Sequence, residues 1–125
     1  YNDSLSNGGG STMTCIFCQI ANKSLNTPLL YEDGDVIAFQ DINPQAPLHA
    51  LIIPKKHIHS LHDSQSEDQL LLGKMLITAK KIAHDHGYHE QGYRLVMNTG
   101  SDGGQTIFHI HLHLLAGRPL TWPPG

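Results

Sequence analysis

The stretch Ile107-Phe-His-Ile-His-Leu-His-Leu-Leu115 places a histidine at every second position. Successive side chains of a β-strand point to opposite faces of the sheet, so His109, His111 and His113 would share one face. The residues between them are apolar and would form the core face: Ile110, Leu112 and Leu114. The pattern predicts a strand over residues 107–116 that is buried on one face and carries three imidazoles on the other.

Three interpretations of the imidazole row are open. It is a solvated strand face, a metal site, or a centre for phosphoryl chemistry in which a neutral imidazole is the nucleophile. Residues i and i+4 of a strand are ~13–14 Å apart, too far for all three histidines to share one ion. The preceding loop, residues 98–106, is rich in glycine and hydroxyl groups, whose backbone amides approach anions closely. This loop favours phosphoryl chemistry.

The other predicted elements surround this strand. Short strands are predicted over residues 29–32, 36–41, 49–54 and 92–98, and Asp33-Gly34 is a hairpin turn signal between the first two. A short helix is predicted over residues 15–22 and a long one over 67–86. Five strands with short connections and one long helix indicate an α+β fold with an antiparallel sheet.

The long helix has its own start, stripe and stop signals. Ser66 and Gln69 form a capping-box pattern at its start, and Gly87 is well placed to end it. Its apolar residues recur at helical spacing and would face the sheet: Leu72, Met75, Leu76, Ala79, Ile82 and Ala83.

The sequence around the histidines resembles the histidine triad (HIT) family, whose signature is His-x-His-x-His followed by apolar residues. The resemblance covers nearly all of residues 15–125 and is strongest to the HinT branch, the purine nucleoside phosphoramidases. The other matching segments are Asp41-Ile-Asn-Pro-Gln-Ala-Pro47, His49, Ile53-Pro-Lys-Lys-His57, Gly100-Ser-Asp-Gly-Gly-Gln105 and Trp122-Pro-Pro-Gly125. The resemblance implies one HIT domain over residues 13–125 and a homodimer. The sheets of the two chains would join edge to edge, and each C-terminal tail would reach the partner's active site.

The resemblance also implies an activity: hydrolysis of nucleoside 5′-phosphoramidates such as AMP-lysine through a covalent nucleotidyl intermediate on His111. His113 would contact phosphate oxygens, and His109 and His49 would hold the network in place. Thr106, where close relatives often have Ser, would donate to the phosphate or the leaving group. The implied nucleotide-binding residues are Asp41 for the ribose, Phe17, Ile20, Leu25 and Ile42 for the base, and Asn98, Gly104 and Gln105 near the phosphate. Without the resemblance, Asp41 also reads as a loop cap and the four apolar residues as core.

Alternatives to this activity stay open. Other histidine triad branches cleave dinucleoside polyphosphates, and the chain also reads as a nucleotide-binding scaffold protein. The Trp122-Pro-Pro-Gly125 ending favours the phosphoramidase branch. The expected ligands are purine nucleotides, derivatives of AMP or GMP, and no organic cofactor is expected.

The two cysteines form a Cys-x-x-Cys pair, Cys15-Ile-Phe-Cys18. The pair is half of a zinc site, a redox pair, or two inert thiols, and no βαβ pattern surrounds it to favour the redox interpretation. In some histidine triad proteins such a pair joins two histidines around structural zinc. The corresponding histidines here are His49 and His109, which predicts a Cys2His2 site with every position filled by protein. The remaining histidines, at residues 57–62 and 84–89, are interpreted as surface residues, with a weak metal site at 84–89 as the minority view.

The composition of the chain limits the classes of protein to which it can belong. The chain has 125 residues, with 8 Lys plus Arg against 11 Asp plus Glu, and a formal net charge of -3. This balance argues against nucleic-acid binding through a basic surface and against a polybasic membrane anchor. Residues 1–12 carry a Gly-Gly-Gly run and are interpreted as a leader or disordered tail before Met13. With no signal segment visible after Met13, the predicted location is the cytoplasm.

Overall fold

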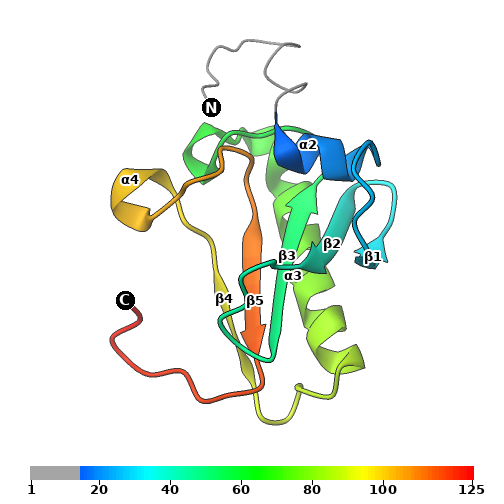
Figure 1. Ribbon diagram of the computed structural model, residues 1–125. Helices are drawn as coiled ribbons and strands as arrows, with labels where there is room; N and C mark the ends of the chain where they lie inside the picture. The colour runs from blue at the N-terminus through cyan, green and yellow to red at the C-terminus, as the bar shows by residue number, and fades with distance from the viewer. Residues whose placement is uncertain (1–14) are drawn as a thin grey trace.

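The computed structural model describes residues 15–125, so the predicted leader over residues 1–12 and the Met13 start lie outside the described residues. A five-stranded antiparallel sheet in the order β1-β2-β3-β5-β4 is the centre of the fold (Figure 1). The strands are β1 (Leu29–Glu32), β2 (Val36–Gln40), β3 (Leu48–Pro54), β4 (Tyr93–Val96) and β5 (Leu112–Ala116). The helices are α2 (Ile16–Ala21), α3 (Gln69–Asp85) and α4 (Gly100–Gly103), with short 3-10 turns at Leu61–Asp63 and Ser66–Asp68. The α+β prediction is confirmed.

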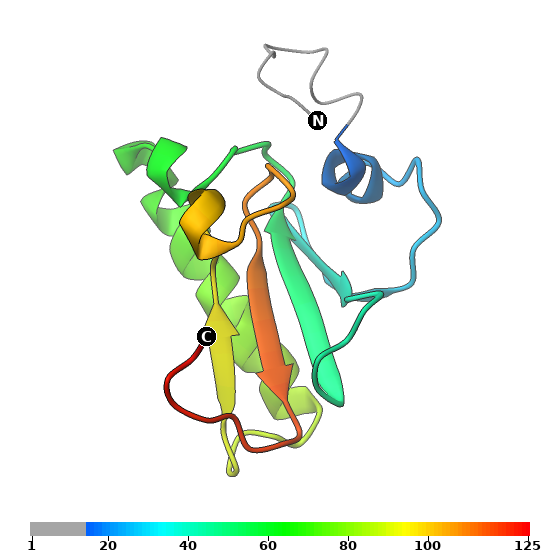
Figure 2. The ribbon, with the colours of Figure 1, turned by 60° about the vertical axis from the view of Figure 1, so that its left-hand side comes forward.

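The two faces of the sheet carry different layers. The long helix α3 covers one face, and the short helix α2 lies against the other (Figure 2). Alternation along β2 and β3 sends Val36, Ala38, Ala50 and Ile52 into the core under α3. The residues between them pack with α2: Ile37, Phe39, Leu51 and Ile53. Within residues 15–125, no helix combines the length and the apolar character needed to cross a membrane.

Strand β5 is shorter than predicted, because it begins at Leu112 and not at residue 107. Its last ladder pair on this side joins Leu112 to Ile52 of β3. Two positions further along β3, Pro54 has no N–H to donate, and its carbonyl oxygen accepts from the His109 ring instead. The N–H of Ile110 donates to the carbonyl of Ile58, outside the sheet. The chain therefore reaches β5 through an irregular segment, and the three histidines do not share one flat strand face.

Helix α3 starts three residues later than its predicted cap. A 3-10 turn over Ser66–Asp68 precedes it, and the Asp68 carboxylate accepts from the N–H of Gln65, so the Ser66–Gln69 capping box is wrong. The predicted stripe holds except at Leu76, which is 49% exposed. Gly87 ends the helix as predicted, with a φ of 84° that L-residues rarely adopt.

The chain after β5 turns back towards β4 at Gly117. This residue has a φ of 103°, and a Cβ there would lie 2.8 Å from Cβ of Pro47 and 3.1 Å from the Tyr88 hydroxyl. The tail beyond it has no helix or strand, as predicted, and passes beside β4, where Nη2 of Arg94 donates to the carbonyl of Thr121 over 2.8 Å (Figures 1 and 2).

The turn between β1 and β2 generates a stability prediction. One carboxylate oxygen of Asp33 accepts from the N–H groups of Asp35 and Val36, and the other accepts from the Tyr31 hydroxyl and lies 3.2 Å from Lys74 of α3. Burial raises the pKa of this carboxyl, but these hydrogen bonds outweigh burial and hold its pKa well below the ordinary range. Such a carboxylate stabilises the fold above its unfolded-state pKa of ~3.9, and the stabilisation is lost as pH falls towards the folded-state pKa.

We expect Asp33→Asn to lower the free energy of unfolding by about 1–2 kcal/mol near neutral pH. Urea unfolding of both proteins near pH 7 and near pH 3 measures the difference, which should shrink in acid. Asp85→Asn is the matched control, because Asp85 pairs with Lys81 on the exposed surface of α3. An equal loss at both pH values would show that the charge of Asp33 is not the cause.

Candidate active site

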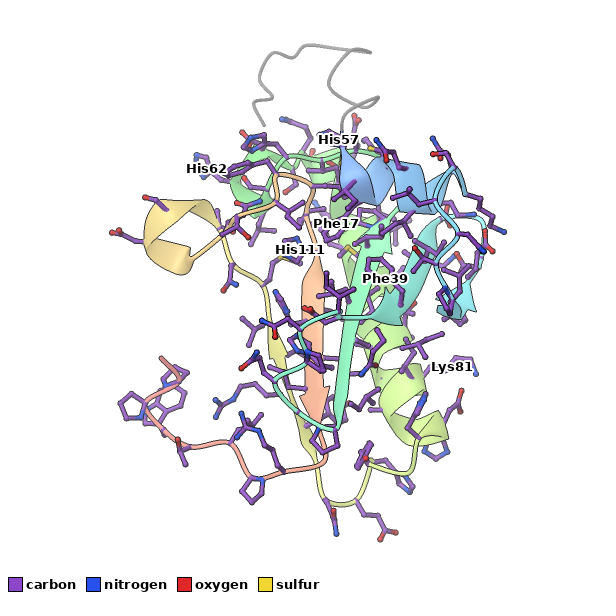
Figure 3. All side chains as sticks on the ribbon, viewed as in Figure 1. Phe17, Phe39, His57, His62, Lys81 and His111 are labelled. Atoms are coloured by element: carbon purple, nitrogen blue, oxygen red, sulfur yellow. The ribbon has the colours of Figure 1, made fainter. Side chains whose placement is uncertain are left out.

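A cavity of about 300 Å³ opens on the α2 face of the sheet. Phe17 of α2 lies edge-on to Phe39 of β2 and to His111, with ring centroids 5.6 and 5.1 Å apart (Figure 3). Apolar side chains form one end of the cavity and polar side chains the other. The predicted site residues that line it are Phe17, Ile20, Asp41, Ile42, Asn98, Gly104, Thr106, His111 and His113. Other apolar lining residues come from the same elements and from the segment before β5: Ile16, Phe39, Leu51 and Ile107.

His111 is buried at this cavity, and its hydrogen bond assigns its tautomer. Its Nδ1 lies 2.8 Å from the backbone carbonyl oxygen of His109, so Nδ1 carries the proton and donates it. The other ring nitrogen, Nε2, is left with a lone pair. Burial lowers the pKa of His111, which keeps the imidazole neutral near pH 7. A neutral, oriented imidazole at a cavity is a competent nucleophile.

A chain of hydrogen bonds also fixes the tautomer of His113. The N–H of Gln45 donates to Nδ1 of His49 over 3.0 Å, so the His49 proton is on Nε2. This Nε2–H lies 2.9 Å from Nδ1 of His113 and 3.4 Å from the carboxylate of Asp41. Because Nδ1 of His113 accepts, the proton of His113 is on its opposite nitrogen, Nε2.

Burial and neighbouring imidazoles keep this network uncharged. The pKa of His113 is lowered to about 4, first by burial and then by repulsion from charged forms of His111 and His49. Burial likewise lowers the pKa of His49, against an opposing effect of Asp41. At neutral pH the cavity therefore presents an Nε2 lone pair on His111 and an Nε2–H donor on His113.

Two predicted nucleotide-binding residues do not line the cavity. Leu25 follows α2 and is 38% exposed, because the chain leaves the sheet face before reaching it. Gln105 is buried, and its amide holds the loop together by accepting from the N–H of Gly100 and donating to the carbonyls of His59 and Ile107. The structure places neither residue at the cavity, and their contact with a nucleotide stays a prediction.

The cysteines meet two histidines on the inner side of α2. Nδ1 of His109 lies 3.3 Å from Sγ of Cys15, 3.4 Å from Sγ of Cys18 and 3.1 Å from Nδ1 of His57. The Sγ of Cys18 lies 3.1 Å from the same His57 nitrogen. Nε2 of His109 donates to the carbonyl of Pro54 over 2.8 Å, which leaves its Nδ1 with a lone pair facing the sulfurs.

His57, and not His49, therefore completes this cluster. The four donor atoms lie within 4.8 Å of one another, whereas His49 belongs to the separate group with Asp41 and His113. The placement of His49 among the predicted metal ligands is wrong, and so is the surface interpretation of His57. A signal was present in the sequence, since His57 ends the Ile53–His57 segment that matches the family pattern. His84 and His89 lie with ring centroids 4.3 Å apart, but within residues 15–125 no third ligand joins them.

The two thiols of the cluster differ in acidity. Burial raises the pKa of Cys15, but hydrogen bonds with His109 and His57 outweigh it and lower this pKa to about 5. Burial and the neighbouring Cys15 raise the pKa of Cys18 to about 12. Both cysteines are free of disulfide bonds.

Comparison with known proteins identifies the family. Residues 14–119 match the family described as the scavenger mRNA decapping enzyme C-terminal binding domain. The chain is 49% identical over 110 residues to an uncharacterized HIT-like protein of Synechocystis sp., covering 88% of this chain and 96% of that protein. A HIT family hydrolase of Legionella pneumophila superposes with a TM-score of 0.87 at 54% identity, covering 89% of this chain and 99% of that one. A histidine triad protein of Clostridium difficile superposes with a TM-score of 0.85 at 44% identity, covering 87% of this chain and 95% of that one. This chain therefore belongs to the HIT-like superfamily of histidine triad proteins and has the fold of its hydrolases.

Proposed function

We propose that the protein hydrolyses nucleoside 5′-phosphoramidates through a nucleotidyl bond to Nε2 of His111. The observation that carries the proposal is the tautomer of His111, whose Nδ1–H donates to the His109 carbonyl and leaves Nε2 free to attack. The nucleoside would fill the adjoining cavity, with its purine base against Phe17 and Ile20 and its ribose hydroxyls on the carboxylate of Asp41.

The reaction would run in two displacements. Nε2 of His111 attacks the α-phosphorus, a phosphorus–nitrogen bond to the imidazole forms, and the bond to the substrate amine breaks. The leaving nitrogen takes a proton from solvent and departs as the amine, while Nε2–H of His113, oriented by the hydrogen bond from His49, donates to a phosphate oxygen. Water then attacks the phosphorus and returns a proton to solvent, and the bond to His111 breaks to release nucleoside monophosphate.

His111→Ala tests the nucleophile with AMP-lysine as substrate. We expect the parent to release AMP and the variant to lose at least about 10³-fold in rate, because no other residue would supply the attacking nitrogen. Mass spectrometry of base-quenched parent should show added AMP that acid-quenched parent lacks, since a phosphorus–imidazole bond survives base and breaks in acid. His62→Ala, an exposed histidine outside the cavity, is the matched control. An AMP adduct on the His111→Ala protein would contradict the assignment.

Cleavage of dinucleoside polyphosphates is the second candidate function. The match of residues 14–119 to the scavenger decapping family favours it. The same nitrogen of His111 would attack, and the leaving group would be a nucleotide in place of an amine. The ratio of kcat/KM for AMP-lysine to that for diadenosine triphosphate decides between the two functions.

We also propose that the cluster of Cys15, Cys18, His57 and His109 binds structural zinc. Tetrahedral ligands at ~2.0–2.3 Å from zinc lie about 3.3–3.8 Å apart. Four of the separations in the cluster are 3.1–3.4 Å, and all donor atoms lie within 4.8 Å of one another. The lone pair of His109 Nδ1 faces the sulfurs, as a ligand requires. With four protein ligands no position is left for water, so the ion would hold α2 against the segment before β5 and take no part in the chemistry.

Metal analysis of purified variants tests the ligand set. We expect one zinc per chain in the parent and in His49→Ala, and little zinc in His57→Ala or Cys18→Ser, because only the latter two remove a donor from the cluster. The variants that lose zinc should also melt at lower temperature. Loss of zinc from His49→Ala with full retention in His57→Ala would overturn the assignment.

A homodimer is proposed on the edge of the sheet. β4 is the last strand in the sheet order, and Ile77 of α3 and Tyr93 of β4 are 63% and 37% exposed beside it. Light scattering should give twice the chain mass of 13.8 kDa, falling to one chain in Ile77→Asp because a charge would be buried. Leu61→Asp adds the same charge on an exposed leucine elsewhere and should leave the mass unchanged. A parent of one chain mass would contradict the proposal.

A further inference from the structure

A second cavity, of about 340 Å³, adjoins the first. His113 and Asn98 line both cavities, so the two meet at the place where the proposed function puts the phosphorus. His49 lies in its wall, and the tail contributes Thr121, Pro123 and Pro124. A group leaving a phosphorus held at His113 has this second cavity open to it.

The second cavity is lined by both arginines of the chain, Arg94 of β4 and Arg118 of the tail. Within residues 15–125, the hydrogen bonds of both side chains run only to carbonyl oxygens. Arg94 donates to Thr121, and Arg118 donates from Nε to Gln45 and from Nη1 to Pro119. These contacts orient the guanidinium groups without neutralising their charge.

The charges of the two arginines are uncompensated within residues 15–125. No carboxylate in that range lies within 4.0 Å of either guanidinium, and the cavity lining contains no Asp or Glu. Five of the six lysines, in contrast, pair with carboxylates: Lys23, Lys55, Lys56, Lys74 and Lys81. A guanidinium has five N–H donors, so both groups keep donors for a ligand.

The two cavities therefore differ in charge. The first contains the carboxylate of Asp41 and no Lys or Arg, which suits an uncharged nucleoside and repels an anion. The second contains two guanidinium groups, which suit a carboxylate or a phosphate through forked hydrogen bonds. A substrate spanning both would place its nucleoside in the first and a negatively charged leaving group in the second.

We propose that Arg94 and Arg118 form an anion subsite for the leaving group, so that the preferred substrates carry a negative charge on the part that departs. This inference rests on the proposed function. For a phosphoramidate the anion is the carboxylate of an amino acid joined through its nitrogen, and for a polyphosphate it is the phosphate of the departing nucleotide. The shared chemistry is a planar or tetrahedral oxyanion beyond the scissile bond.

A matched pair of substrates tests the subsite: the adenosine 5′-phosphoramidates of β-alanine and of β-alaninamide, which differ in one carboxylate. The parent should prefer the carboxylate in kcat/KM. In Arg94→Gln and Arg118→Gln the carboxylate-to-amide ratio should fall about tenfold, because a charged hydrogen bond is lost. The intrinsic difference between the two amines cancels in this ratio. Diadenosine triphosphate in a parallel series shows whether a departing phosphate uses the same arginines.

The control is Lys81→Gln, which removes the same charge from the far side of α3, away from His111 (Figure 3). It should leave the ratio unchanged, and a fall there would show a general effect of charge. If the arginine variants lose kcat/KM equally on both substrates, the arginines only hold the tail in place, and the subsite is overturned.

Binding measurements keep the subsite separate from the chemistry. In a His111→Ala background, calorimetry gives the dissociation constants of the same pair without turnover. If the parent turns over neither substrate but the carboxylate binds about tenfold tighter and loses that advantage in the arginine variants, the proposed function fails and the subsite stands. No difference in affinity or in kcat/KM between carboxylate and amide overturns the subsite whatever the parent hydrolyses.

Discussion

Both ring nitrogens of the buried His109 are held, Nε2 by the carbonyl of Pro54 and Nδ1 by the cysteines and His57. A ring fixed at both nitrogens restrains its own backbone, and the carbonyl oxygen of that backbone is the acceptor that sets the tautomer of His111. The ring of His111 is thus oriented by a residue with no exposed surface and no place in the cavity wall. The same bond to Pro54 marks where the regular sheet stops and the irregular approach to β5 begins.

The two faces of the sheet keep the core under α3 separate from the cavities. Alternation along β2 and β3 gives α3 one face and leaves the other for α2 and the cavities. The six-residue helix α2 contacts two neighbours, since Phe17 lines the first cavity while Cys18, together with Cys15 just before the helix, lies against His109. On the same face β5 presents His113, which lines the same cavity.

The period-two pattern, the hairpin signal at Asp33 and the helical stripe were enough to predict the α+β fold and all five strands, because these are local signals. The start of β5 was predicted too early in the chain, because the missing N–H of Pro54 acts across strands that are distant in sequence. The choice of His49 over His57 failed for a similar reason. His49 lies at the start of β3 and His57 lies beyond its end, and the direction in which each side chain points then decides which of them meets the cysteines. Spacing along a chain does not encode that direction, and neither does it show that Leu25 turns away from the cavity.

The absence of a Cβ atom at Gly117 shapes the second cavity, because it allows the chain to turn against Pro47. A single methyl group at this position would overlap Pro47 and press on Tyr88, and the backbone angle would itself be strained. Every larger residue is excluded on the same grounds, so the position has almost no mutational tolerance although it lines neither of the two cavities. This constraint sets the direction in which the tail leaves β5. It therefore also sets the position of the cavity wall that the tail forms beside Arg94 and Arg118. Substitutions in the tail can change the side chains that line the second cavity, but the path of the tail backbone away from Gly117 stays the same.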